Sequence, residues 1–329
     1  MKKLFLCFLT LTMCLFLTPS SVNANANTDV ANSTSEKEES KGTELVLSEK
    51  NSVADYADFT LFKILTTQKI SASISDNIYY PNENSGETFV DIILDWTNTS
   101  TETISCNDIL VVSATSGSGT EYTNGLYVVE TDNSTRVSQY ENIAPLSTVR
   151  LHCAISVPEN ETDLTLKLTI KDKEYTYDYS LGEVASNAKE LKVGDTIEEA
   201  DYATLVFNGI EYTDDLLPTD TSGFYSHYEV DNASNTYLVV KYDITNYMSS
   251  EKDCKTYVGV KASYMNKYTY TGFVTVEDED GKGFSDYEKI APLTTRHFYH
   301  LIEVPKTVTE NEVVLTFSFN GQEYTYTGK

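Results

Sequence analysis

The chain has few cysteines and histidines, and its negative charges far outnumber its positive ones. Its 329 residues include 5 cysteines, 4 histidines, 24 lysines and arginines, and 50 aspartates and glutamates, which gives a formal net charge of −26. Such an acidic chain argues strongly against nucleic acid and anionic lipid as partners, because both are polyanions. The simplest role of the charge is to keep the protein soluble.

Only Cys106, Cys153 and Cys254 lie beyond residue 26. Three thiols do not make the disulfide framework of a small secreted scaffold. A bridge between Cys106 and Cys153 is one possibility and free thiols are the other, because spacing in the sequence does not fix the distance between two sulfur atoms. Cys254 is then a free thiol or pairs with another molecule.

Long apolar runs are absent except at the N-terminus. The chain opens with two lysines, continues with an apolar stretch at 4–17, and reaches Ala-Asn-Ala at 24–26. This order is typical of a signal peptide, so we expect residues 1–26 to be removed. Loss of the two lysine charges takes the net charge from −26 to −28. Lipidation of Cys14 is the alternative, although Met13 fits poorly where a lipobox carries a small residue.

The segment after the signal peptide, "NTDVANSTSEKEESKG" at 27–42, is polar and charged and has no aromatic residue. It predicts a disordered spacer. No later segment is apolar and long enough to span a membrane, for which roughly 20 residues are needed. We therefore predict a secreted, extracellular protein with at most a loose association with the cell envelope.

The rest of the sequence repeats itself. Four groups of residues recur in the same order at nearly constant offsets, which indicates two copies of one domain with small changes in loop length. The anchors are "ADYA" (54–57 and 200–203), the pairs Asn98/Asn246 and Cys106/Cys254, "YENIAPL" (140–146) with "YEKIAPL" (287–293), and "EYTY" (174–177 and 323–326).

Hydrophobic residues alternate with polar ones inside each copy, as expected for half-buried strands. Asn320-Gly321, a strong hairpin signal, separates two such runs near the end of the chain. The pattern predicts an all-β chain of two tandem immunoglobulin-like antiparallel β-sandwiches at 43–184 and 189–329, after the signal peptide and spacer. The alternating positions are Val90, Ile92, Leu94 and Trp96, Leu164 to Ile170, and Val313 to Phe319.

The repeated phrase "IAPL" stands directly before a segment that ends in a second proline, so that Pro145 and Pro158 enclose one strand and Pro292 and Pro305 the other. Proline lacks a backbone donor and suits the end of a strand. We interpret the phrase as the entrance to the same strand in both copies, not as a catalytic motif.

Both copies resemble the telokin-like, immunoglobulin-like extracellular domains of unknown function in secreted proteins and lipoproteins of Gram-positive bacteria. The resemblance lies in "VKYDITN" at 240–246, more loosely in "IILDWTN" at 92–98, and in the segments "IAPL…AISVP" and "IAPL…LIEVP". Leu146 and Leu293 stand where that family has a glycine, so we expect a different turn there. The resemblance implies an exported β-sandwich and no established catalytic residues.

The histidines do not suggest an active site. His297 and His300 are three residues apart on a predicted strand and should point to opposite faces, which does not suit a shared metal ion. His300 takes the place of Cys153, and His152 the place of Tyr299, so neither recurs at its own position. We expect no enzymatic activity and no cofactor.

An acidic turn, "VEDEDGKGF" at 276–284, partly matches a calcium-binding loop. Asp278 and Asp280 fit the template, but Val276 and Tyr287 stand where the first and last ligands belong. An ordinary turn rich in Asp and Gly is the alternative and the better fit.

Tyrosine is abundant, with 24 residues that gather in "SYMNKYTYTGF" (263–273), "YTYDY" (175–179) and "GFYSHYEV" (223–230). Tyrosine is both a common strand residue and a common binding anchor. We predict an exposed patch of Tyr264, Tyr268 and Tyr270, because this segment differs between the copies.

Three hypotheses on function follow, in order of preference. The first is a surface interaction module that binds an extracellular protein or glycan. The second is a structural spacer or envelope-associated protein without a specific ligand. The third is a hydrolase, which the lack of a clustered triad disfavours.

Overall fold

The computed structural model describes residues 42–265 and 268–329. The predicted signal peptide and nearly all of the predicted spacer lie outside these residues. The described chain is almost entirely β-structure, which confirms the predicted fold class. Its helices are three short 3-10 turns, and no helix of the described part is long and apolar enough to cross a membrane. They are η1 (Cys106–Asp108), η2 (Cys254–Thr256) and η3 (Lys306–Val308).

The first sandwich spans 43–186 and pairs two sheets across one core. One sheet has the order β1 (Thr43–Glu44), β15 (Lys173–Ser180), β14 (Asp163–Ile170), β8 (Val111–Ser116) and β9 (Glu121–Tyr122). The other has β11 (Arg136–Ser138), β10 (Gly125–Thr131), β13 (Thr148–Pro158), β6 (Glu87–Asn98), β3 (Ala57–Thr67) and β16 (Val184–Ser186), and β2 (Lys50–Val53) also pairs with β3. Two small pairs are β4 (Lys69–Ser71) with β5 (Tyr79–Pro81), and β7 (Ile104–Ser105) with β12 (Asn142–Ile143).

The second sandwich spans 189–328 and is built in the same way. One sheet has the order β17 (Lys189–Glu190), β31 (Gln322–Gly328), β30 (Val313–Phe319), β24 (Val258–Tyr264) and β25 (Tyr268–Thr271). The other has β18 (Thr196–Glu199), β19 (Ala203–Thr213), β22 (Asn235–Asn246), β29 (Thr295–Pro305), β26 (Phe273–Glu277) and β27 (Phe284–Ser285). The small pairs are β20 (Asp215–Leu216) with β21 (Tyr228–Glu229), and β23 (Lys252–Asp253) with β28 (Lys289–Ile290).

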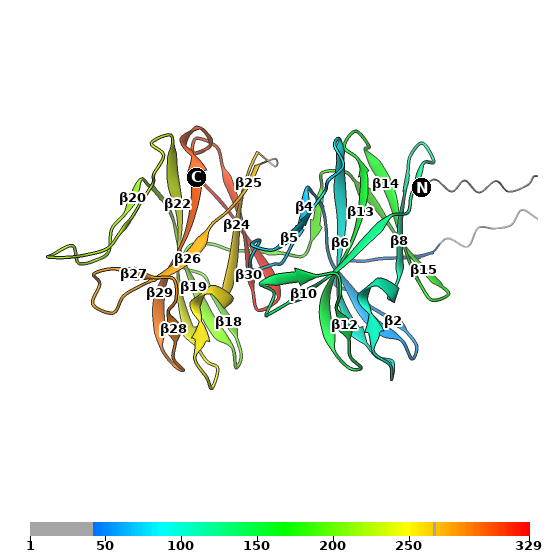
Figure 1. Cartoon of the computed structure of the whole chain (residues 1–329), viewed down its shortest axis with the longest axis horizontal. Helices are drawn as coiled ribbons and strands as arrows, with labels where there is room; N and C mark the ends of the chain where they lie inside the picture. The colour runs from blue at the N-terminus through cyan, green and yellow to red at the C-terminus, as the bar shows by residue number, and fades with distance from the viewer. Residues whose placement is uncertain (1–41, 266–267) are drawn as a thin grey trace, which may run out of the picture. The chain divides into compact units, whose positions relative to one another are not determined.

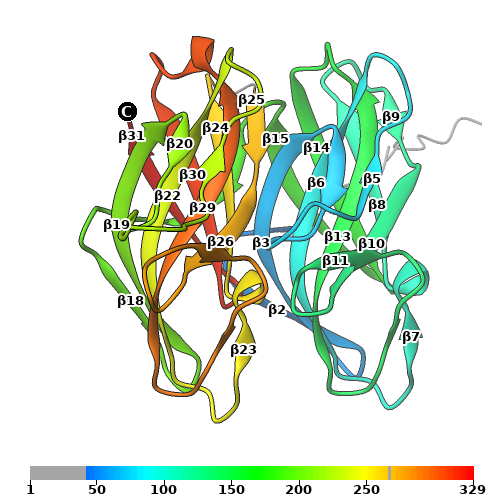
Figure 2. The ribbon, with the colours of Figure 1, turned by 60° about the vertical axis from the view of Figure 1, so that its left-hand side comes forward.

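Each strand of the first sandwich from β1 to β15 has a counterpart sixteen numbers later in the second (Figures 1 and 2). β16 has none and closes the first sandwich, so strand pairing extends two residues past the predicted boundary at 184. The pairing is antiparallel except at the first strand of each sandwich, since β1 runs parallel to β15 and β17 to β31. The sheets are thus antiparallel as predicted, apart from these two short edge strands.

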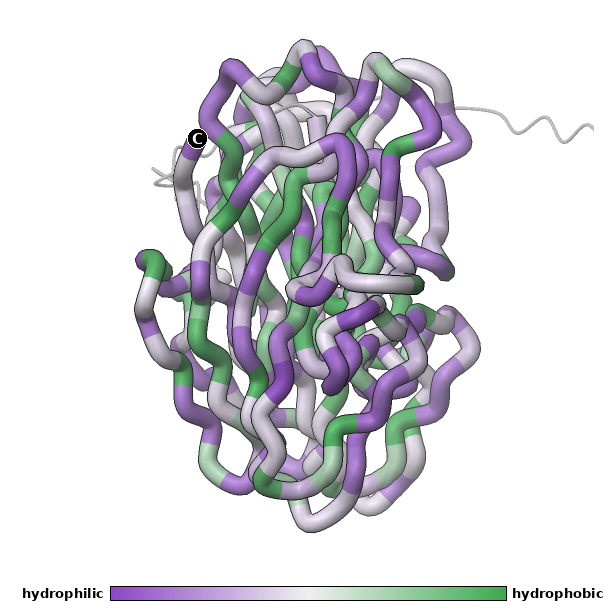
Figure 3. The backbone as a smooth tube through the Cα atoms, turned by 90° about the vertical axis from the view of Figure 1, so that its left-hand side faces the viewer, coloured by the Kyte–Doolittle hydropathy of each residue, from purple (hydrophilic) through white to green (hydrophobic). Residues whose placement is uncertain are grey.

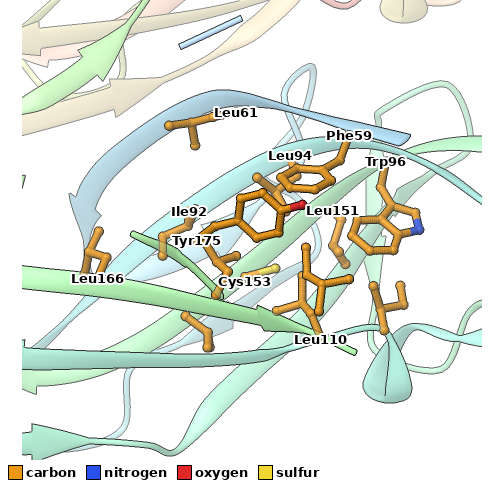
Figure 4. Packing of buried hydrophobic residues seen from close by; sticks show 14 of the residues in the cluster. Phe59, Leu61, Ile92, Leu94, Trp96, Leu110, Leu151, Cys153, Leu166 and Tyr175 are labelled. Carbon is orange, nitrogen blue, oxygen red and sulfur yellow. The ribbon is translucent and has the colours of Figure 1, made fainter. Parts of the chain in front are cut away.

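The two cores are separate, and each is rich in aromatic rings. In the first sandwich Trp96 stacks on Phe59 with ring centroids 5.7 Å apart, and Tyr175 meets Phe59 edge-on at 5.0 Å (Figure 4). In the second, Phe207 contacts Phe317 at 5.2 Å. Figure 3 shows hydrophobic and hydrophilic residues alternating along the strands, as the sequence pattern predicts.

The repeated phrase forms the turn that leads into β13 or β29. The buried Asn98 amide donates to the Ile143 carbonyl oxygen (2.9 Å), and the Leu146 N–H donates to the Asn98 carbonyl oxygen (2.8 Å). Leu146 has a φ of 62°, in the left-handed region that glycine usually occupies. The leucine therefore adopts a backbone conformation that favours glycine. Asn246, Ile290 and Leu293 (φ 59°) repeat this arrangement.

Candidate functional site

The first sandwich contacts the second through the loop between β4 and β5, residues 72–78. The Lys261 ammonium group of β24 donates to the Ala72 carbonyl oxygen (3.3 Å). The Thr271 hydroxyl group of β25 donates to the Asp76 carboxylate (2.9 Å). This loop therefore acts as a docking element within the chain, and we call the contact between the sandwiches the junction.

Close backbone approach and a buried ion pair complete the junction. A Cβ atom at Gly259 would lie 2.5 Å from the Ile74 Cα, so only glycine fits there. The corresponding residue of the first sandwich is Val111, which is 58% exposed. Lys63 donates to both carboxylate oxygens of Glu323 at 2.9 and 2.7 Å, and both side chains are about nine-tenths buried.

Three ionisable side chains meet behind the docking loop. The His152 ring lies between Asp91 (2.8 Å) and Glu130 (3.2 Å), and the Ser73 hydroxyl group of the loop donates to Glu130 (2.6 Å). Burial would lower the pKa of His152, but the Asp91 carboxylate and then Glu130 outweigh it and raise the pKa to about 9. Burial would raise the pKa of Glu130, but the hydrogen bond from His152 outweighs it and lowers the pKa to about 2.

These charges do not make a catalytic site. At neutral pH the His152 ring is protonated and has no lone pair with which to act as a base. Asp91, Glu130 and His152 are 3%, 8% and 2% exposed, so a substrate has no access to them. The cluster instead fixes the docking loop to the sheet.

The corresponding loop of the second sandwich connects β20 to β21 and is longer, with residues 217–227 against 72–78. Its start is fixed in the same way. The Thr219 N–H and hydroxyl groups donate to Glu277 at 2.6 and 2.5 Å, as those of Ser73 do to Glu130. Figure 1 shows this yellow-green loop extending from the second sandwich beside the turn between β26 and β27.

That turn, the acidic segment 278–283, supports the loop through its backbone. The Asp220 N–H donates to the Gly281 carbonyl oxygen (2.7 Å), and the Ser226 N–H donates to the Lys282 carbonyl oxygen (2.9 Å). A Cβ atom at Gly283 would lie 2.4 Å from the Ser226 hydroxyl oxygen, so the contact is close. The loop is therefore held at both ends.

Between its supports the loop exposes apolar side chains. Phe224 is 94% exposed and Leu217 48% exposed. The Tyr225 ring packs beside His227 with centroids 5.8 Å apart, and Tyr228 contacts Phe273 of β26 at 5.1 Å. An isolated phenylalanine this exposed on an anchored loop resembles the aromatic anchors of protein interfaces. We call residues 217–227 the presenting loop.

The surroundings of the presenting loop are acidic. Hydrogen bonds from Ser222 lower the pKa of Asp220, and a hydrogen bond from Lys306 lowers that of Asp214, so both stay ionised at neutral pH. The hydrogen bond to Asp215 (2.6 Å) raises the pKa of His227. The carboxylates in or beside the loop and its supporting turn are Asp214, Asp215, Asp220, Glu229, Asp231, Asp278, Glu279 and Asp280.

The structure does not form the predicted patch of exposed tyrosines. Tyr264 is 0% exposed, and its hydroxyl group is hydrogen-bonded to that of Tyr212 (2.9 Å). Tyr270 packs against the core and meets Tyr264 edge-on, with ring centroids 5.9 Å apart. Tyr268, on the edge strand β25, is 43% exposed. The prediction is wrong for Tyr264 because it shares the inward face of β24 with Val260 and Ala262.

The acidic turn closes with its own hydrogen bonds. The Gly281 N–H donates to the Asp278 carbonyl oxygen (2.9 Å), and the Asp280 carboxylate accepts from the Lys282 N–H (3.0 Å). Within residues 42–265 and 268–329, no three or more His, Cys, Asp or Glu side chains gather as a metal site would require.

Cys106, Cys153 and Cys254 are all free thiols, and all are buried. Burial raises the pKa of each. His297 and His300 point to opposite faces, as predicted: His297 pairs with Asp243 (2.6 Å) at the surface. His300 is 4% exposed and, within the described chain, has no hydrogen-bond partner.

Sequence reasoning missed two groups of residues. The Asp91, Glu130 and His152 cluster carries only a faint signal, an aspartate in an otherwise apolar stretch of 89–94. The presenting loop has a clearer one, because Phe224 lies within the tyrosine-rich segment 223–230.

No protein-family model matches the sequence, and no curated protein matches it. Among solved structures, the chain is similar to an uncharacterized β-sandwich protein from Clostridium difficile 630, known from a crystal structure at 1.90 Å resolution. The two sequences are 30% identical, the similarity covers 44% of this chain and 97% of that chain, and the TM-score is 0.41. The similarity points to no ligand or activity for either protein.

Proposed function

We propose that this chain is a secreted, non-enzymatic interaction protein that binds a protein partner through the presenting loop of its second sandwich. One observation carries the proposal. The loop at the same place in the first sandwich is a docking element that contacts another β-sandwich, whereas the presenting loop extends outward and exposes Phe224. A surface used for contact in one copy is a natural site for contact in the other.

The chemistry around the loop suggests the kind of partner. A central aromatic side chain with a polar rim is the usual anatomy of an interface. Because the rim is rich in carboxylates, a partner with an apolar pocket and a positively charged border fits best. Secretion rests on the N-terminal pattern at 1–26, and the assignment to the telokin-like, immunoglobulin-like domains rests on the sequence resemblance.

One observation favours the structural spacer as a second candidate. The Lys63–Glu323 pair is almost completely buried between the sandwiches, and Arg150 donates to the Gly321 carbonyl oxygen (2.9 Å). Such contacts hold two domains in one arrangement. A rigid arrangement suits a spacer, but it also suits a protein that must present a loop.

Binding of purified residues 27–329 to isolated cell envelope and to candidate host-surface material tests the proposal. We expect saturable binding that Phe224→Ala weakens by roughly tenfold or more, because an aromatic anchor contributes about 2 kcal/mol or more. Binding should also weaken as salt rises.

Tyr140→Ala is the matched control, because Tyr140 is a 79% exposed aromatic residue of the first sandwich. Equal binding by all three proteins would place the contact outside the presenting loop. If the folded wild-type chain binds neither material, the spacer becomes the better proposal.

A further inference from the structure

A pocket of about 260 Å³ lies at the junction, beside the segment that links the sandwiches. The first sandwich contributes Thr60, Phe62, Asp95 and Ser186 to its wall, the linking segment Asn187, and the second sandwich Gln322. The volume is below the roughly 300–1,000 Å³ of pockets for drug-sized ligands, so it suits a smaller molecule.

A β-bulge shapes the apolar part of the pocket. Strand β3 shifts register between Leu61 and Lys63, so Phe62 is an extra residue opposite β6. Leu61 and Ile64 point into the core, and both residues between them point outward. The Arg150 guanidinium group lies 3.5 Å from the centroid of the Phe62 ring and holds it in place.

The charges beside the pocket are paired within the protein. One carboxylate oxygen of Asp95 accepts from Arg150 (2.8 Å), and both carboxylate oxygens of Glu323 accept from Lys63. Among the described residues, the second oxygen of Asp95 has no such partner and remains a strong acceptor. The pocket therefore does not call for a charged ligand.

Several neutral polar groups in the pocket have free hydrogen-bonding capacity. Within the described chain, the Gln322 amide and the Thr60 hydroxyl group have no side-chain partner. Asn187 donates to the Ser48 hydroxyl oxygen (2.8 Å), which leaves its own carbonyl oxygen free. Ser186 accepts from the Ala188 N–H (3.3 Å), which leaves its hydroxyl hydrogen free.

We infer that the junction pocket binds a single neutral sugar ring. A hexose has hydroxyl groups that both donate and accept, and C–H faces that pack on apolar groups. The free amides, hydroxyls and carboxylate oxygen match the first feature, and the Phe62 side chain in the pocket wall matches the second. The inference does not depend on the presenting loop.

The pocket exists only where the two sandwiches meet. At the places of Thr60 and Phe62 the second sandwich has Val206 and Asn208, and no further sandwich of the described chain covers them. One site per chain is therefore expected.

Calorimetric titration of residues 27–329 with D-glucose, D-galactose and N-acetyl-D-glucosamine tests the inference. At least one of these probes should bind at one site per chain with a Kd on the order of 1 mM. Gln322→Ala, Asn187→Ala and Asp95→Asn should each weaken binding by about 2- to 10-fold, because each removes one hydrogen bond to the sugar. Asn160→Ala, at an exposed turn of the first sandwich, should leave binding unchanged.

Three outcomes would overturn the inference. They are the absence of binding by any of the three sugars, binding that all the variants retain, and binding of calcium chloride or ethanolamine in place of the sugars. Gln322→Glu keeps the size of the side chain and replaces the amide donor by a carboxylate oxygen, which only accepts. If this variant binds the sugar more weakly but unfolds at the same temperature as the wild type, the weaker binding reflects a lost contact and not unfolding.

Discussion

The same place in the two sandwiches holds three buried ionisable side chains in the first, two of which a tyrosine and a valine replace in the second. His152 and Asp91 of the first sandwich correspond to Tyr299 and Val239 of the second. Tyr299 contacts Glu277 (3.4 Å), as His152 contacts Glu130. The fold therefore tolerates both sets of side chains at this place.

A second difference lies beside the cluster, where the neighbouring sandwich covers the first sandwich. Ile93 is 8% exposed beneath the junction, whereas its counterpart Lys241 reaches solvent and pairs with Glu211 (2.8 Å). Gly209 stands at the place of Lys63, which forms the buried ion pair of the junction. A third sandwich packed on the equivalent face of the second would lack the contacts that Lys63 and Ile93 make at the junction, so the junction is specific to this pair of sandwiches.

The largest effect is expected from removal of the central cation. His152→Leu leaves Asp91 and Glu130 buried without their partner, which should lower the free energy of unfolding by about 3–5 kcal/mol. The double variant His152→Tyr with Asp91→Val installs the residues of the second sandwich and should recover most of this loss. Urea unfolding measures both. A double variant no more stable than His152→Leu would show that the two places are not equivalent.

The next effect concerns the pH dependence of His300. Burial lowers its pKa from 6.5 to about 4. Between these values the unfolded chain binds a proton that the folded chain does not, so the free energy of unfolding falls as the pH decreases from 6.5 to 4. His300→Cys gives the second sandwich the cysteine that the first has at the equivalent position, Cys153. In this variant the fall in the free energy of unfolding between pH 6.5 and pH 4 should be smaller by about 3 kcal/mol.

Urea unfolding at several pH values measures this difference, with His297→Ser as the control for a histidine at the surface. The same dependence on pH in wild type and His300→Cys would contradict the expectation.

The smallest effect tests the close approach at the junction. Gly259→Ala adds a Cβ atom against the backbone of Ile74 and should lower the free energy of unfolding by about 1–3 kcal/mol. Val111→Ala, at the corresponding exposed place, should change it by less than about 0.5 kcal/mol. Thermal unfolding of both variants checks this contrast, which equal midpoints would refute.

The sequence predicted the features that depend on local pattern. The alternation of apolar and polar residues identified the core strands around Trp96 and Ile244. The offset of the repeat is sufficient to show that His152 and Tyr299 occupy equivalent positions in the two copies. The same alternation continues along β24, and applied to Tyr264 it would have placed that residue in the core.

Features that depend on distant segments were not predictable in this way. The cluster of Asp91, Glu130 and His152 needs three strands, β6, β10 and β13, and a loop to cover them. The sugar pocket needs Thr60 and Gln322, which are far apart in the chain. No local sequence pattern predicts such contacts, because they form only when the two folded sandwiches pack against each other.

The Lys63–Glu323 contact also bears on the order in which the protein is completed. Lys63 is made 260 residues before its partner Glu323. Until the hairpin of β30 and β31 exists, one face of the first sandwich stays uncovered. That face carries the charged residues Lys63, Asp95 and Arg150 beside the apolar Phe62 and Ile93, so its charges limit the apolar surface that the incomplete protein exposes to water.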